Sequence, residues 1–172
     1  EHLISPAAPA ESHGMEDARF VRFIDDDGSV TYYATYTAYD GMRILPQMIK
    51  TKDFNHFRMT TMSGPTAYHK GLALFPRKIR GDFAAVSRHD QETTFVMRSD
   101  NVRHWGNAEA VLVPEQGWES IQTGNCGSPL ETDAGWLLIT HGVGPMRRYV
   151  LGAVLLDLDE PTKVLGRLTS PL

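Results

Sequence analysis

The sequence has little of several features that define common classes of protein. Cys126 is the one cysteine among 172 residues, which excludes an internal disulfide framework and favours a reducing compartment such as the cytoplasm. No apolar run approaches the roughly 18 residues of a membrane-spanning helix, and the longest, Val150–Leu156, stops at Asp157. There is no basic excess, because 17 Lys and Arg stand against 21 Asp and Glu. The formal charge of −4 argues against nucleic acid or an anionic membrane as the main partner.

The chain also lacks the sustained 3.6-residue apolar period of a long helix. Its hydrophobic residues, 41% of the total and enough for a core, fall in short β-branched and aromatic runs between tight turns. Two such runs, Phe20–Ile24 and Val30–Thr37, flank the turn Asp25–Gly28. An Asp-Gly turn in this setting is a strong hairpin signal. The sequence therefore predicts an all-β fold.

Three hairpin turns recur at a regular distance along the chain. Their glycines, Gly28, Gly81 and Gly135, are 53 and 54 residues apart. The strands expected around them are 18–24 and 30–38, 71–75 and 83–87, and 126–130 and 136–140, with further runs at 58–62, 94–97, 149–156 and 164–168. About four strands in about 50 residues is typical of a β-propeller blade, which gives blade-like units at about 15–64, 65–118 and 119–172. A β-sandwich of short strands is the alternative.

Three units fall short of the about four to eight blades that close a propeller, and an open propeller leaves sheet edges exposed. The chain also begins at Glu1 without a methionine and stops at Ser170-Pro171-Leu172. We therefore expect either an excerpt of a longer protein or a propeller that another chain completes, a homo-oligomer being one form of that assembly.

The repeat brings chemically useful positions together. Eleven residues before the hairpin glycines stand Asp17, Lys70 and Gly124, where the inner strand of each blade would begin. Inner strands line the central channel of a propeller, so these positions are expected to converge. Counting six or seven residues forward from the glycines places Arg88 and His141 toward the same mouth. An acid, a lysine, an arginine and a histidine gathered in this way predict a site for a sugar or an anionic ligand.

Each motif also has a structural interpretation, which the residues alone leave open. Asp17 and Arg19 suit proton transfer, or they form an ion pair in a solvated loop. The aromatic run Tyr32–Asp40 stacks on sugar rings, or it packs in the core. The segment Gly124–Pro129 lets the backbone approach a ligand, or it forms a bulge. Spacing alone favours the structural interpretation of Asp17, and its common position in the repeat gives the functional interpretation equal weight.

Several kinds of site have no counterpart in the sequence. The seven histidines lack the spacing of a zinc site, so we predict no metal ligand and no cofactor. A Gly-rich nucleotide loop, a Gly-x-Ser-x-Gly elbow and the kinase motifs are all missing. Spacing places no base beside Cys126, which favours a buried apolar residue over a nucleophile.

Taken together, the motifs resemble those of glycoside hydrolase family 130, the inverting β-mannoside phosphorylases and β-mannosidases, over nearly the whole chain. The segments that carry the resemblance are 16–19, 32–40, 70–78, 99–100 with Trp105, 124–129, 135–138, 140–144 and 155–161. It implies a five-bladed β-propeller, which agrees with the independent repeat. It also implies a β-mannooligosaccharide as substrate and inorganic phosphate as co-substrate.

The resemblance further implies the roles of individual residues. Asp17 would be the general acid, protonating the glycosidic oxygen through a sugar hydroxyl while phosphate attacks the anomeric carbon from the opposite face. Arg19 would position or tune that acid. The other residues implied for binding phosphate or sugar hydroxyls, or for lining the pocket, are Lys70, Arg88, Asn125 and His141.

Two positions depart from the family pattern. A phosphate-contacting lysine expected nineteen residues before His141 is Gln122 here, and the residue before Lys70, often Asn, is His69. The loss of one cation weakens the case for phosphorolysis without removing it, because Arg88 and His141 remain.

Two other functions therefore stay open. An inverting β-mannosidase would need a second carboxylate, about 6.5–9.5 Å from the acid, to activate water. Glu119 and Glu131 are the candidates, chosen for their nearness to the site motifs. The other alternative is a non-catalytic propeller that binds sugar with the same aromatic residues.

Overall fold

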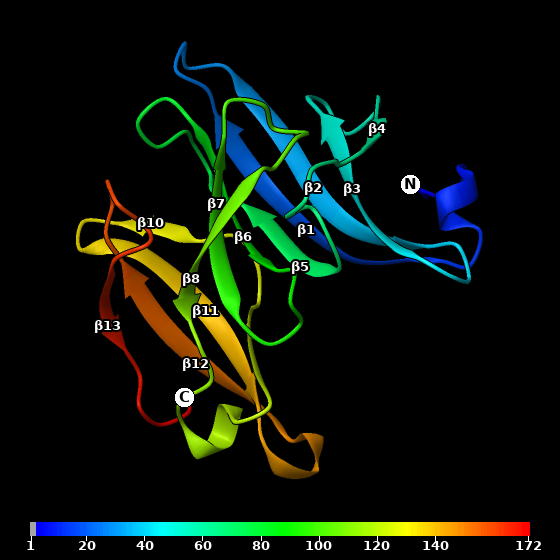
Figure 1. The fold of residues 1–172 in the computed structure, drawn as a ribbon. Helices are drawn as coiled ribbons and strands as arrows, with labels where there is room; N and C mark the ends of the chain where they lie inside the picture. The colour runs from blue at the N-terminus through cyan, green and yellow to red at the C-terminus, as the bar shows by residue number, and fades with distance from the viewer. Residues whose placement is uncertain (1–2) are drawn as a thin grey trace.

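Residues 3–172 are described by a computed structural model, in which they form three antiparallel β-sheets joined by turns and short 3₁₀ helices (Figure 1). The first sheet contains β1 (Met15–Ile24), β2 (Val30–Tyr39), β3 (Ile44–Thr51) and β4 (Arg58–Thr61). The second contains β5 (Lys70–Leu74), β6 (Phe83–Arg88), β7 (Thr94–Ser99) and β8 (Asn107–Leu112). The third contains β9 (Gln122–Asn125), β10 (Leu130–Thr132), β11 (Gly135–Val143), β12 (Tyr149–Leu156) and β13 (Val164–Arg167). The 3₁₀ helices are η1 (Pro9–Glu11), η2 (Gly117–Glu119) and η3 (Pro145–Arg147).

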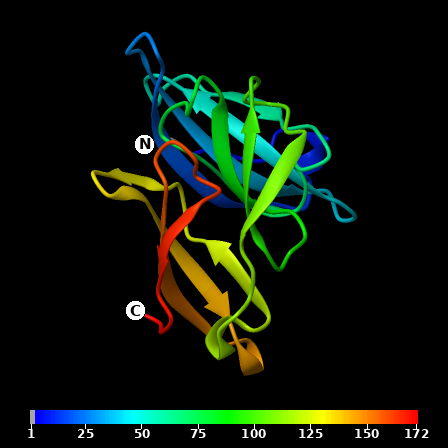
Figure 2. The ribbon, with the colours of Figure 1, turned by 60° about the vertical axis from the view of Figure 1, so that its left-hand side comes forward.

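Each sheet has the plan of a propeller blade, with successive strands side by side. In the third sheet β9 and β10 both pair with the same edge of β11, opposite 140–143 and 135–137 respectively, and together they form one interrupted inner strand. The second sheet lies between the other two (Figures 1 and 2). None of the helices within residues 3–172 is both long and apolar enough to cross a bilayer.

The glycines that define the repeat lie at the hairpins between the first and second strands of each blade. Gly28, Gly81 and Gly135 have φ angles of 79°, 87° and 145°, which residues with a side chain rarely adopt. The all-β fold and the blade repeat are therefore confirmed. Because three separate sheets replace two facing ones, the β-sandwich alternative was wrong.

The strands differ from the sequence prediction at three places. β3 was not predicted, because Pro46 interrupts its pattern. The pairing of β3 with β4 ends at Gln47, however, so Pro46 lies just outside that ladder and is tolerated. β8 was also missed, since it mixes small and polar residues. Of the predicted strand 126–130, residues 126–129 instead form the gap between β9 and β10, where Pro129 has no N–H to donate, and only Leu130 belongs to a strand.

Large apolar side chains fill the two seams between the blades. At the first seam, between the first and second blades, the rings of Phe23 and Phe83 stack with centroids 5.3 Å apart, and Trp105 is fully buried nearby. At the second seam, between the second and third blades, the ring of Phe75 meets that of Trp136 edge to face at 5.1 Å. Burial of these rings holds each blade against the next.

We expect Trp136→Ala to lower the free energy of unfolding by about 3–5 kcal/mol, because it opens a cavity at the second seam. The indole is fully buried, lies under the Arg77 guanidinium at 4.9 Å, and donates from Nε1 to the carbonyl of Leu158 at 3.0 Å. Urea denaturation measures the loss. Phe54→Ala, at a ring that is 43% exposed, is the control and should cost far less. Equal losses for the two variants would contradict the seam assignment.

The inner strand of every blade breaks its hydrogen-bonded ladder near the same end. In β1 the register shifts between Glu16 and Arg19, and Asp17 takes a φ of 57°. In β5 it shifts between Lys70 and Ala73, with Gly71 at a φ of 87°. The gap between β9 and β10 is the corresponding break in the third blade. These irregularities turn side chains out of the regular strand alternation, and they lie where the sequence predicts the site.

Candidate active site

Arg88 and His141, which the repeat places toward one mouth, meet across the second seam. Arg88 ends β6, His141 lies in β11, and Arg88 Nη1 is 3.1 Å from His141 Nε2. Gly124, opposite His141 in the ladder, makes this approach possible. A Cβ at Gly124 would lie 2.6 Å from His141 Cε1 and 2.9 Å from Arg88 Nη1. The two side chains that the spacing argument directs to one mouth are therefore in contact in the structure.

Asp17 belongs to the same charged cluster from the first blade. Its side chain is exposed at the break in β1, and among residues 3–172 its carboxylate has no hydrogen-bond or ion-pair partner. Burial lowers the pKa values of Arg19, Arg88 and His141, and the negative charge of Asp17 opposes that shift in all three. Asp17 is thus a free carboxylate that lies close to both guanidinium groups.

Several buried polar atoms of this cluster have no hydrogen-bond partner among residues 3–172. They are Arg19 Nη1, Arg88 Nε, Asn125 Oδ1 and Ser128 Oγ. A Cβ at Gly71 would lie 3.5 Å from Asn125 Oδ1 and 3.3 Å from Arg88 Cβ, which puts the amide beside the arginine. An unpaired buried polar group costs about 1–3 kcal/mol. A polar ligand that draws these head groups toward it would supply the missing partners.

His141 is neutral in this arrangement. Arg88 has only donors, so Nε2 of His141 accepts and the ring proton is on Nδ1, which faces Cys126 Sγ at 3.8 Å. Burial, together with the charges of Arg88 and Arg19, lowers the pKa of His141 to about 4. His141 therefore orients the Arg88 guanidinium and adds no positive charge of its own, which the sequence could not reveal.

A pH dependence of stability follows from this neutral histidine. The unfolded chain binds a proton at a histidine pKa of about 6.5, whereas folded His141 binds one only near pH 4. Between these values protonation favours the unfolded chain, so this group lowers stability as the pH falls from about 6.5 to about 4. We expect the melting temperature of His141→Gln to drop less over that range than that of the wild type. Equal drops in thermal scans would refute this expectation.

The charges of the cluster favour an anionic ligand. Arg19 and Arg88 are positive, Asp17 is negative, and His141 is neutral. Cys126 is exposed in the structure, not buried as the sequence favoured. Partial desolvation nevertheless raises the pKa of its thiol, against a lowering by Arg19, so the thiol is uncharged as well. Two partly buried guanidinium groups face the free carboxylate of Asp17, while Asp90, which also acts on Arg88, is engaged by the backbone N–H groups of Glu92 and Thr93. Paired guanidinium donors of this kind suit a phosphate.

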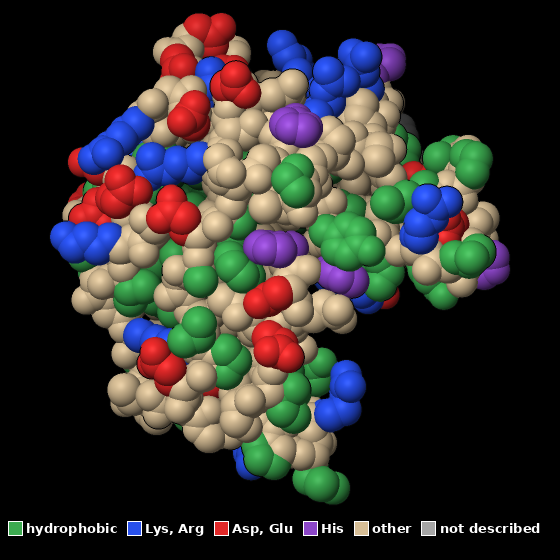
Figure 3. Space-filling model, viewed as in Figure 1, with side chains coloured by type: hydrophobic (Ala, Val, Ile, Leu, Met, Phe, Trp, Pro, Cys, Tyr) green, Lys and Arg blue, Asp and Glu red, His purple; other side chains and the backbone are tan. Residues whose placement is uncertain are grey.

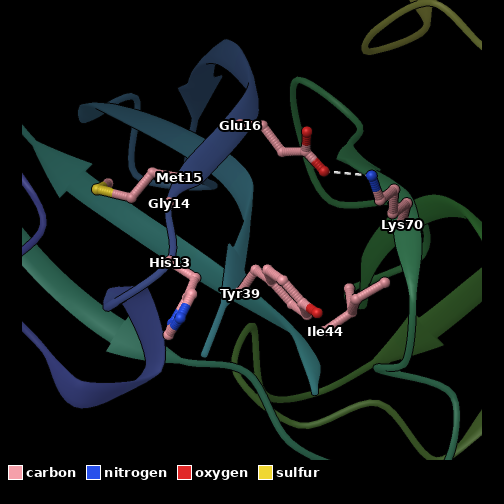
Figure 4. A pocket seen from close by; sticks show the side chains of 7 residues that line it. All are labelled: His13, Gly14, Met15, Glu16, Tyr39, Ile44 and Lys70. Carbon is pink, nitrogen blue, oxygen red and sulfur yellow. Dashed lines mark hydrogen bonds and ion pairs between the residues drawn. The ribbon is translucent and has the colours of Figure 1, made fainter. Parts of the chain in front are cut away.

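Lys70 lies beside this cluster but points into a different pocket. It stands opposite Arg88 in the β5–β6 ladder, and its ammonium forms an ion pair with Glu16 of the first blade. Figure 4 shows the two side chains pointing toward each other, with His13 and Tyr39 on the other side of the pocket. The pocket measures about 460 Å³, and the two rings meet edge to face at 6.1 Å. A charged pair facing aromatic rings is suited to a sugar.

Tyr149 is a residue of the cluster that the sequence reasoning missed. Its ring centroid lies 5.9 Å from that of His141, with the two ring planes tilted by 32°. In the β11–β12 ladder His141 pairs with Leu151, so Tyr149 is the diagonal neighbour on the same face. Counting two residues along the next strand of the hairpin would have found it.

Neither candidate for a hydrolytic base is free in the structure. Glu131 binds Arg77 with both carboxylate oxygens at 3.0 Å or less. Glu119 is 2% exposed and is held by Arg167 and by the backbone N–H of Gln116. Both carboxylates therefore have structural roles that compete with the activation of water.

The structure also bears on Gln122 and on metal binding. Gln122, in place of the expected lysine, begins β9 opposite Val143, two residues beyond His141 in β11. Within residues 3–172, no group of three or more His, Cys, Asp or Glu side chains is arranged to hold a metal ion.

The three sheets have the plan of propeller blades, and comparison with known proteins identifies the family. The family described as Glyco_hydro_130, beta-1,4-mannooligosaccharide phosphorylase, matches residues 1–172. The 1,2-beta-oligomannan phosphorylase of Thermoanaerobacter sp. (strain X514) is 32% identical over 99% of this chain and 56% of its own. The beta-1,2-mannobiose phosphorylase of Listeria innocua is 30% identical over 99% of this chain and 48% of its own. Its solved complex with beta-1,2-mannobiose superposes with a TM-score of 0.84 over 97% of this chain and 47% of that one, at 28% identity.

The chain belongs to glycoside hydrolase family 130. Its three sheets are three blades of the five-bladed propeller found in this family. The chain spans about half the length of the relatives that it matches.

Proposed function

We propose that this chain forms part of an inverting phosphorylase that cleaves β-mannosidic bonds with inorganic phosphate. One observation carries the proposal: a free carboxylate, Asp17, lies near two partly buried guanidinium groups, Arg19 and Arg88, whose charge exceeds its own. Such a site holds an anionic nucleophile and a proton donor at once.

The residues perform separate steps in this reaction. In its protonated form, Asp17 gives a proton to a substrate hydroxyl, and that hydroxyl passes its own proton to the glycosidic oxygen as the bond between that oxygen and the anomeric carbon breaks. The bonding electrons leave with the oxygen, and a phosphate oxygen bonds to the anomeric carbon from the opposite face. Arg88, oriented by His141, holds the phosphate, and Arg19 positions or tunes Asp17. Inversion converts the β-mannoside into α-mannose 1-phosphate and a shorter sugar.

The pocket lined by Glu16 and Lys70 is suited to bind part of the sugar chain. It adjoins Asp17 through Glu16, the residue directly before the acid, and combines an ion pair with the rings of His13 and Tyr39. We assign it to sugar units on the leaving side of the bond, and Asn125 to the wall beside Arg88.

Hydrolysis by an inverting β-mannosidase is the second candidate function, and Gln122 in place of a cationic residue favours it. The held carboxylates of Glu119 and Glu131 count against it, because an inverting hydrolase needs a base to activate water. Sugar binding without catalysis is the third candidate, and the free carboxylate of Asp17 beside uncompensated cations counts against it.

The deciding experiment incubates the full-length gene product with β-1,2- and β-1,4-mannobiose, with and without inorganic phosphate. We expect phosphate-dependent release of mannose 1-phosphate. Release of free mannose at a rate independent of phosphate would establish the hydrolase instead. Binding of both disaccharides without turnover would establish a sugar-binding protein. Both linkages are tested because the family description names β-1,4 and the two relatives name β-1,2.

Two predictions accompany this function. A cytoplasmic location rests on the single cysteine, and intracellular phosphate would be available there. A homo-oligomer stays a prediction, which light scattering of the gene product would test.

A further inference from the structure

The seams between the blades carry charged contacts that are nearly all complementary. The ion pairs across them include Lys70 with Glu16, and also Lys78 with Asp25 and Asp26, Arg77 with Glu131, and Arg80 and Arg98 with Glu160. The N···O distances of the pairs made by Lys78, Arg77, Arg80 and Arg98 are 2.6–3.2 Å. Each links a basic residue of the second blade to an acid on a neighbouring blade.

One place at the first seam breaks this rule. Lys50 on β3, Arg58 on β4 and Arg103 from the β7–β8 loop line a pocket of about 180 Å³, here called the seam pocket. No Asp or Glu of residues 3–172 forms an ion pair with any of the three. Figure 3 shows a group of Lys and Arg side chains at the upper edge of that view, over β3 and β4.

The cations of the seam pocket repel one another in the structure as it stands. Lys50 and Arg58 are direct partners in the β3–β4 ladder, and like charges in that position are destabilising. The chain as a whole has more acids than bases, so the lack of a carboxylate here is not a matter of composition. A multivalent anion would remove the repulsion.

The other walls of the seam pocket also suit an anion. Thr60 lies on its floor, and its buried hydroxyl has no hydrogen-bond partner among the described residues. Lys50 Nζ lies 5.6 Å from the centroid of the Tyr33 ring, and Met48 is buried below. The pocket therefore has two guanidinium forks, an ammonium and a hydroxyl above an apolar base. Forked donors of this kind match the oxygens of a tetrahedral oxyanion.

We propose that the seam pocket binds the phosphate group of inorganic phosphate or of a phosphate monoester. This site lies at the outer strands β3 and β4, apart from Arg19 and Arg88, and its occupation joins the first blade to the second. A bound dianion thus replaces the missing seam ion pair. A monovalent anion would neutralise only one of the three cations.

The test titrates inorganic phosphate into the full-length gene product by calorimetry. We expect two phosphates per chain in the wild type and one in Arg58→Gln/Arg103→Gln, with kcat and the KM for phosphate unchanged. Lys163→Gln, which removes a cation of the third blade, is the matched control and should keep both sites. Equal binding by the wild type and the double variant would overturn the proposal.

Further measurements keep the test decisive. If the double variant does not fold, Lys50→Gln replaces it and should raise the Kd of the second site by about tenfold. Mannose 1-phosphate, added in place of phosphate, distinguishes inorganic phosphate from a phosphate monoester as the ligand. The titration uses Arg88→Met, in which the other phosphate site is weakened, so binding there shows that the seam pocket accepts monoesters. Chloride is added at matched ionic strength as a control. If it displaces bound phosphate as well as phosphate itself does, the binding is simple charge screening and the site is refuted. The count of two phosphates rests on the proposed function. If the phosphorylase assay fails, the double variant should still bind one phosphate per chain fewer than the wild type, so the two failures are distinguishable.

Discussion

Replacing Asp17 with asparagine is expected to lower kcat for mannose 1-phosphate release by about 10²–10⁴-fold, the usual contribution of a general acid. Asparagine has nearly the same size and tolerates the positive φ of 57° at this position, so the fold should persist. It carries no proton to give to the leaving oxygen. Initial rates with saturating phosphate and β-mannobiose measure the effect.

The neighbouring carboxylate provides the matched control. Glu16→Gln weakens the ion pair with Lys70 but leaves Asp17 in place, so its main effect should be on the KM for the sugar. The phosphate KM of Asp17→Asn should stay close to that of the wild type. Unchanged turnover in Asp17→Asn would overturn the assignment of the acid.

Gly124→Ala is expected to lower kcat/KM for phosphate by about 10²-fold, because it displaces the groups that hold the nucleophile. The added Cβ would lie within 2.9 Å of both His141 and Arg88, so at least one of them must move. Gly124 does not have a positive φ, and alanine therefore meets no backbone strain there. The effect should appear in phosphate kinetics while the melting temperature changes little.

Gly127→Ala controls for a glycine replacement in the same segment. A Cβ at Gly127 would have no atom within 4 Å, so kinetics and stability should both stay near those of the wild type. If Gly127→Ala loses as much kcat/KM for phosphate as Gly124→Ala, the loss comes from a change in the backbone of this segment and not from displacement of Arg88 and His141. Normal phosphate kinetics in Gly124→Ala would show that the contact between Arg88 and His141 is dispensable.

The repeat made most of the fold predictable because its signals are local. An Asp-Gly turn between apolar runs specifies a hairpin without reference to distant residues, and Asp27-Gly28 is the clear case. β8 could not be predicted in this way, because Asn107–Leu112 carries little apolar alternation and owes its place to pairing with β7. The break at 126–129 was missed because Cys126 and Leu130 have the residue types of a strand.

For the candidate site, the sequence indicated which residues lie together but not which of them are charged. The repeat counts placed Arg88 and His141 together, because equivalent positions of successive blades face one axis. Whether an imidazole is charged depends on its burial and on the donors around it, and here Arg88 makes it an acceptor. Lys70 is directed away by Glu16, a partner that lies 54 residues earlier and that no local pattern reveals.

The ladder breaks of β1, β5 and β9–β10 have a consequence for how such a protein can change through evolution. Each break lies on a different blade, and the strand that follows it resumes a regular register of its own. Mutation at one break therefore leaves the pairing of the other two blades intact. A mutation at one break can therefore alter the site while the other blades keep their fold. In this way the sugar preference of such a protein can evolve one blade at a time.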